Sequence, residues 1–116
     1  MRRPWASLGL GAALLAAGPA FGHARLLGTV PAADARLTAP PPSLILRFNE
    51  NVRLGVLKLT TAGREVPVTI ERNAAPAEMV TVPLPRLAAG KYDVQWSALT
   101  DSDGHAVKGG YSFVIE

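Results

Sequence analysis

The chain has 116 residues, 48% of them hydrophobic, no cysteine, and a formal charge of +3 at pH 7. Without cysteine, neither disulfides nor thiolate metal sites can stabilise the fold, so an apolar core has to do so. Two of the twelve basic side chains, Arg2 and Arg3, lie at the extreme N-terminus, which leaves ten basic against nine acidic side chains in the rest of the chain. This near balance, with no basic run, argues against nucleic-acid binding.

The first 22 residues have the order of a secretory signal peptide. A basic start is followed by an uncharged apolar run over residues 8–17, then by Gly18, Pro19 and small residues. A helix of that length spans about 15 Å, half the hydrocarbon thickness of a membrane, so the run is too short for a stable transmembrane helix. We therefore expect an exported protein that is not embedded in the membrane.

Three cleavage positions suit the small residues at the end of this segment. They would make His23, Phe21 or Arg25 the first residue of the mature chain. Composition does not choose among them.

After residue 23 the chain consists of short apolar stretches separated by Pro, Gly and Asn, with no long segment of helical period. Strict alternation of apolar and polar residues, or a similar strand pattern, is found in seven segments: 24–30, 43–50, 54–60, 66–70, 80–84, 92–98 and 111–115. About seven short strands with turn signals between them predict an all-β fold, a small antiparallel Greek-key β-sandwich of immunoglobulin-like type.

Three features of this pattern are expected to be structural. Tyr92, preceded by Leu87 and Gly90, resembles a tyrosine corner, in which the hydroxyl group bonds back to the preceding backbone. Trp96 lies in the most regular alternating segment and is expected in the core. The prolines at 40–42 cannot donate ladder hydrogen bonds, so they predict an extended connector.

The two histidines of the chain both stand outside the middle of apolar segments. His105 follows Asp103 by two residues in a polar loop, and the intervening Gly104 allows both side chains to turn toward one ion. Such a triplet by itself is usually turn chemistry, with the aspartate bonded to local backbone and the histidine in solvent.

Cleavage after Gly22 would give His23 a free α-amine beside its ring nitrogen Nδ1. Both groups can lose their protons to a metal at neutral pH. With His105 and Asp103 they would supply three nitrogens and one oxygen, the tetragonal donor set that Cu(II), and less often Ni(II), prefers. The alternative is that His23 is only the frayed first residue of the mature chain.

The mature chain resembles the CopC family of periplasmic copper-binding proteins over nearly all of residues 23–116. The resemblance is carried by the order and spacing of several short motifs: His23-Ala24 directly after the signal, Pro31-Ala32-Ala33-Asp34-Ala35, Leu46-Arg47-Phe48-Asn49-Glu50, the segment 90–96, Asp103-Gly104-His105, Gly109 and Phe113. It implies a signal peptide over residues 1–22 and a copper-binding domain over residues 23–116.

By this resemblance one Cu(II) ion per mature chain is bound by the amine and ring nitrogen of His23 and by Asp103 and His105. Glu50 matches a family carboxylate near the site, as an extra ligand or as a neighbour of the ligands. The alternative for Glu50 is a solvated residue just past the end of a strand.

The resemblance further implies a periplasmic carrier or buffer in copper homeostasis or resistance, without catalytic turnover, with a CopD-like inner-membrane protein as partner. We also expect the protein to be a monomer. Better-known members also carry a methionine-rich loop that binds Cu(I). Here Met79 is the one methionine after Met1, and one thioether cannot make such a site. We therefore expect a member that binds Cu(II) only.

Two other functions fit parts of this pattern. Lytic polysaccharide monooxygenases also use an N-terminal histidine with a second histidine on a β-sandwich, although this chain is short for a polysaccharide-binding face. An immunoglobulin-like binding module without metal is the other alternative.

Overall fold

The computed structural model describes residues 24–116 and contains seven β-strands and no helix in that range. The strands are β1 (Leu26–Val30), β2 (Arg36–Leu37), β3 (Ser43–Thr61), β4 (Arg64–Val66), β5 (Ala77–Pro83), β6 (Gly90–Thr100) and β7 (Ala106–Ile115). The all-β prediction with about seven strands is confirmed. The predicted signal peptide and His23 lie outside the described residues. In residues 24–116 no helix is long and apolar enough to cross a membrane.

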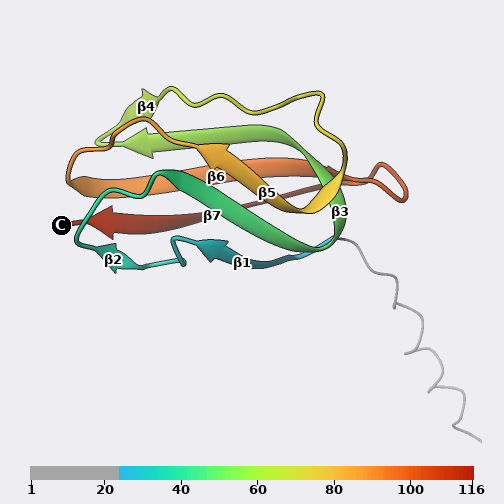
Figure 1. The fold of residues 1–116 in the computed structure, drawn as a ribbon, viewed down its shortest axis with the longest axis horizontal. Helices are drawn as coiled ribbons and strands as arrows, with labels where there is room; N and C mark the ends of the chain where they lie inside the picture. Colours follow the sequence, from blue (N-terminus) through green and yellow to red (C-terminus); the bar gives the residue numbers. More distant parts are fainter. Residues whose placement is uncertain (1–23) are drawn as a thin grey trace, which may run out of the picture.

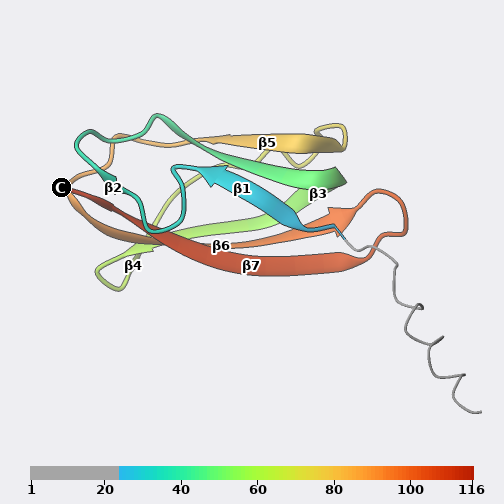
Figure 2. The ribbon, with the colours of Figure 1, turned by 90° about the horizontal axis from the view of Figure 1, so that it is seen from below.

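Strand β3 belongs to both layers of the sandwich. Its first half pairs antiparallel with β1 and β5, and its second half pairs antiparallel with β6 and β4. The register of the pairing with β5 breaks between Arg47 and Val52, and β3 passes from one layer to the other there (Figure 2). A local irregularity of this kind is how a strand bends to switch sheets.

The second layer is completed by β7, which pairs antiparallel with β6. The two-residue strand β2 pairs in parallel with the end of β7, through Arg36 opposite Val114 and Leu37 opposite Ile115. β2 was not predicted from the sequence, because two residues carry no periodic signal.

Three of the predicted strand segments differ from the structure. The segments 43–50 and 54–60 form one continuous strand of 19 residues. The segment 66–70 is wrong as a strand beyond Val66, because Pro67 has no N–H to continue the ladder. Val68 and Ile70 nevertheless pack partly buried against the core.

The core lies between the two layers and is built from the inward-facing residues of β3, β5, β6 and β7. Phe48 and Trp96 meet edge to face, with ring centroids 5.2 Å apart, and Trp96 is 6% exposed. The Tyr92 hydroxyl donates a hydrogen bond of 2.7 Å to the Ala88 carbonyl, which confirms the tyrosine corner. The prolines at 40–42 lie outside the strands, as the connector interpretation predicted.

The loop of residues 101–105, between β6 and β7, lies at one end of the sandwich. The described chain begins at that same end with residue 24, and the C-terminus lies at the opposite end (Figure 1). The fold therefore brings the start of the described chain and the Asp103–His105 loop to one end of the molecule.

Candidate metal site

Two backbone hydrogen bonds close the β6–β7 loop at its base. Thr100 N–H donates to the His105 carbonyl at 2.9 Å, and Gly104 N–H donates to the Thr100 carbonyl at 2.9 Å. Gly104 has a φ of 69°, in the left-handed region that glycine adopts without a Cβ penalty. The glycine between the two candidate ligands therefore makes this tight loop possible.

Asp103 and His105 lie together on this loop, and both are exposed. Asp103 Oδ1 accepts a hydrogen bond of 3.0 Å from the backbone N–H of His105, and a second one from the hydroxyl of Thr100. The carboxylate is thus bonded directly to the backbone that carries the imidazole. One loop offers both an oxygen and a nitrogen donor to solvent.

Glu50 lies within β3, not past the end of a strand, so the alternative of a residue beyond a strand end is wrong. Its side chain is half-buried, and Glu50 Oε1 accepts a hydrogen bond of 3.0 Å from Ser102 Oγ. Because Ser102 is the residue before Asp103, this bond joins β3 to the loop. A further bond between them, from Asp101 N–H to the Asn51 carbonyl, measures 3.0 Å.

The first described residues are fixed beside Glu50. The backbone N–H of Arg25 donates to Asn49 Oδ1 at 2.6 Å, and Asn49 N–H donates back to the Arg25 carbonyl at 3.1 Å. Ala24 is 4% exposed and belongs to the core cluster. Residues 24 and 25 are therefore held next to the strand segment that contacts the loop.

The four predicted site residues thus differ in their position relative to the β6–β7 loop. Asp103 and His105 share the loop, Glu50 contacts the loop through Ser102, and His23 lies outside the described residues. Within residues 24–116 the structure has no group of three or more His, Cys, Asp or Glu side chains placed to hold a metal ion. The carboxylate and imidazole that the loop does provide are both donors that Cu(II) accepts.

Thr100 and Ser102 contact the candidate ligands but were not singled out from the sequence. Thr100 continues the alternation of buried positions through Val94, Trp96 and Ala98, and it is 3% exposed. The sequence could have indicated the role of Thr100, because it is a threonine at an inward-facing position directly before a polar loop. A buried hydroxyl needs a hydrogen-bond partner, and the loop is the nearest source of one.

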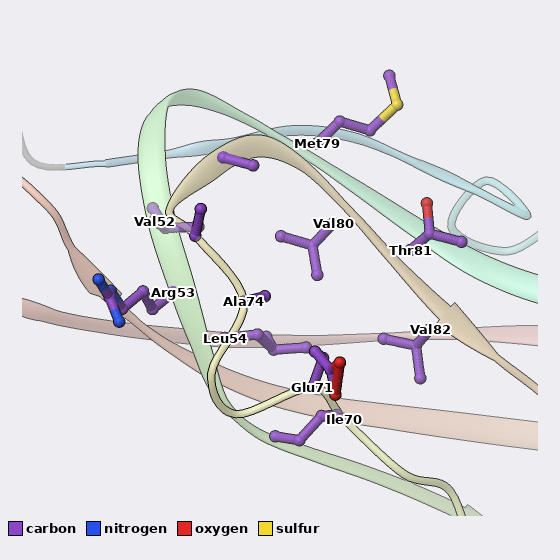
Figure 3. Close-up of a pocket in the computed structure, with 12 residues that line it drawn as sticks. Val52, Arg53, Leu54, Ile70, Glu71, Ala74, Met79, Val80, Thr81 and Val82 are labelled. Carbon is purple, nitrogen blue, oxygen red and sulfur yellow. The ribbon is translucent and has the colours of Figure 1, made fainter.

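The molecule also has a cavity of about 140 Å³ between β3, β5 and the connection 67–76 (Figure 3). Its lining is mainly apolar and includes Leu54, Val80 and Val82, with Glu71 as the one carboxylate and no histidine. Met79 lies in β5 with 55% of its surface exposed, and its thioether points away from the cavity. The cavity therefore lacks the donors of a copper site.

The fold and the loop define a small β-sandwich protein with a carboxylate and an imidazole exposed together at one end. A family model described as the CopC domain matches residues 26–116, and the chain belongs to this family.

Named relatives are similar over most of their length. The chain is 34% identical over 108 residues to copper resistance protein C of Escherichia coli. The alignment covers 84% of this chain and 84% of that protein. The solved structure of PcoC, a methionine-rich copper resistance protein from Escherichia coli, matches with a TM-score of 0.67 and 35% identity, over 82% of this chain and all of that one. The structure of CopC from Methylosinus trichosporium OB3b matches with a TM-score of 0.69 and 28% identity, over 81% of this chain and 94% of that one.

Proposed function

We propose that the exported protein, after removal of residues 1–22, binds one Cu(II) ion in the periplasm. The ligands are the α-amine and ring nitrogen of His23, the carboxylate of Asp103 and the imidazole of His105. The protein acts as a carrier or buffer in copper homeostasis or resistance, and it performs no chemical turnover.

The observation that carries this proposal is that the start of the described chain and the loop both bond to the same short stretch of β3. Arg25 is bonded to Asn49, and the next residue, Glu50, is bonded to Ser102 on the loop. Residue 23 is separated from Arg25 by Ala24 alone in the sequence, so we expect the new N-terminus to lie near the loop. Membership of the CopC family and the copper resistance proteins among the relatives support the same function.

Selectivity for oxidised copper follows from the available ligands. Soft thioether groups favour Cu(I), whereas imidazole, amine and carboxylate groups favour Cu(II). The related PcoC is described as methionine rich, whereas this chain has two methionines in all, Met1 and Met79. A single thioether in β5 cannot replace a cluster, so we expect no separate Cu(I) site.

Delivery requires that another protein can reach the ion. Asp103 and His105 are exposed at the end of the sandwich, so an incoming ligand can approach them without unfolding the domain. The partner that suits this role is a CopD-like inner-membrane protein, with the copper carrier itself a monomer.

Glu50 is assigned the role of holding the loop. Its Oε1 already accepts the Ser102 hydroxyl, and its side chain is half-buried at the bend of β3. We assign it the role of acting on the site through Ser102, and its role as a ligand is the alternative that the Glu50→Gln variant tests.

The test is a Cu(II) titration of the exported protein, followed by electron paramagnetic resonance. We expect one equivalent to bind, with a tetragonal spectrum that shows nitrogen coupling. The matched control is a variant whose cleavage leaves one additional glycine in front of His23, which converts the α-amine into a peptide nitrogen. Equal affinity and an equal spectrum in the extended protein would exclude the proposed N-terminal ligand.

A further inference from the structure

Thr100, the last residue of β6, is buried at the base of the loop that carries Asp103 and His105. Its side chain is 3% exposed, and among residues 24–116 no other polar or charged residue is buried. A hydroxyl group removed from water is costly unless it is hydrogen-bonded. The hydrogen-bond partners of the Thr100 hydroxyl therefore indicate its role.

The hydroxyl bonds to both candidate ligand residues. Thr100 Oγ1 donates to Asp103 Oδ1 and accepts from the backbone N–H of His105, at 2.9 Å in the second bond. The same N–H lies 3.0 Å from Asp103 Oδ1. The hydroxyl, the carboxylate oxygen and the amide therefore form one closed set of hydrogen bonds.

The backbone of Thr100 is fixed by the strands as well as by the loop. Thr100 is the register partner of Val52 on β3, and its own N–H and carbonyl bond to His105 and Gly104. The hydroxyl is therefore attached to a backbone that the sheet holds in place. A carboxylate bonded to it takes its orientation from the sandwich and not from the exposed loop alone.

We propose that Thr100 is a positioning residue of the copper site, whose hydroxyl holds the Asp103 carboxylate in the orientation in which it binds the same ion as His105. This inference rests on the proposed function. Valine has nearly the same shape as threonine but can neither donate to the carboxylate nor accept from the amide. Groups that orient metal ligands in this way are worth about 10–100-fold in metal affinity.

The experiment compares Thr100→Val and Thr100→Ser with the wild-type protein, each recovered from the periplasm after export of the full chain. Cu(II) affinity is measured by competition with a chelator, and the copper environment by electron paramagnetic resonance. Thr61→Val is the matched control, because it removes a threonine hydroxyl that donates to the Lys91 carbonyl at 2.8 Å, in a different part of the sandwich from the loop.

We expect Thr100→Val to lower Cu(II) affinity by about 10–100-fold and to change the resonance spectrum. Thr100→Ser, which keeps the hydroxyl, should retain the wild-type spectrum even if the smaller side chain lowers the melting temperature. Thr61→Val should bind copper as the wild type does. If the Val variant does not fold, Thr100→Ala provides the same comparison with Thr100→Ser.

Two outcomes would overturn the inference in distinguishable ways. If the wild-type protein binds one Cu(II) and the Val variant matches it in affinity and spectrum, the positioning role is wrong and the proposed function stands. If the wild-type protein binds no Cu(II), both fail together.

Discussion

Ser102 Oγ donates a hydrogen bond of 3.0 Å to Glu50 Oε1, and this bond joins the β6–β7 loop to the bend of β3. The next residue of the loop is Asp103, and the residue before Glu50 is Asn49, which holds Arg25. A single side-chain contact therefore connects the proposed ligand loop to the strand that fixes the start of the described chain.

Replacement of Glu50 by glutamine tests whether this residue holds the loop or binds copper. Glu50→Gln keeps an oxygen that can accept from Ser102 but removes the negative charge. We expect the loss of Cu(II) affinity to stay below the roughly 10–100-fold that follows removal of a group that orients a metal ligand, because glutamine keeps the hydrogen bond to Ser102. A loss as large as that in His105→Ala would show instead that Glu50 is a ligand.

Removal of a proposed loop ligand should abolish tight copper binding without unfolding the domain. In Asp103→Ala and His105→Ala we expect Cu(II) affinity to fall by more than about 100-fold, the upper range for groups that only orient ligands. Both side chains are exposed, so little core packing is lost. Chelator competition measures the affinity, and the melting temperature without copper measures the fold.

The matched control for these variants is Asp101→Ala. Asp101 is an exposed carboxylate on the same loop, and its recorded contact to Asn51 is made by its backbone N–H. It should bind copper like the wild type. A loss in Asp101→Ala as large as that in Asp103→Ala would mean that the loop attracts copper through its negative charge and not through Asp103 as a specific ligand.

Copper should raise the stability of the folded protein. A ligand that binds the native state alone adds RT ln(1 + [L]/Kd), about 4 kcal/mol at a thousandfold excess over Kd. We expect an increase in melting temperature on addition of Cu(II), and no increase in His105→Ala. An unchanged wild-type melting temperature would favour the alternative of a binding module without metal.

Stability at high pH should depend on Tyr111. Burial raises the pKa of Tyr111 from its ordinary value of 10.0 to about 12, and its buried hydroxyl has no hydrogen-bond partner among the described residues. Between pH 10 and 12 the unfolded tyrosine loses its proton while the folded one retains it, so the free energy of unfolding falls as the pH rises. Below about pH 10 this group gives no pH dependence.

Urea unfolding of the wild type and of Tyr111→Phe, carried out from pH 8 to pH 12, measures this effect. The Phe variant should lose less stability above pH 10 than the wild type, and at neutral pH it should be at least as stable, because it lacks the unpaired hydroxyl. Parallel curves for the two proteins would contradict the raised pKa.

The sequence predicted most of the strands because apolar residues alternate with a period of two. The predicted break between 43–50 and 54–60 was wrong, although the inward positions continue in step from Leu44 to Leu54. The chain bends between the two layers without leaving the strand. The phase then shifts by one residue between Leu54 and Val56, where the register with β6 is irregular.

The candidate site was predicted in part. The spacing of Asp103 and His105 placed both side chains on one polar loop, and their role as ligands comes from the resemblance to the CopC family and stays a prediction. The contact between Ser102 and Glu50 could not be predicted, because it joins residues 52 positions apart and depends on where β3 bends. The position of Thr100 could be read from the alternation, but its bonding partners depend on how the loop closes.

The most direct test of the proposed site is the intact mass of the protein recovered from the periplasm, measured under native conditions with and without copper. We expect the mass of residues 23–116, increased by one copper ion when copper is supplied. A mature protein that begins at Phe21 or Arg25 and still retains one tightly bound Cu(II) would contradict the proposal, because copper would then be bound without the α-amine of His23.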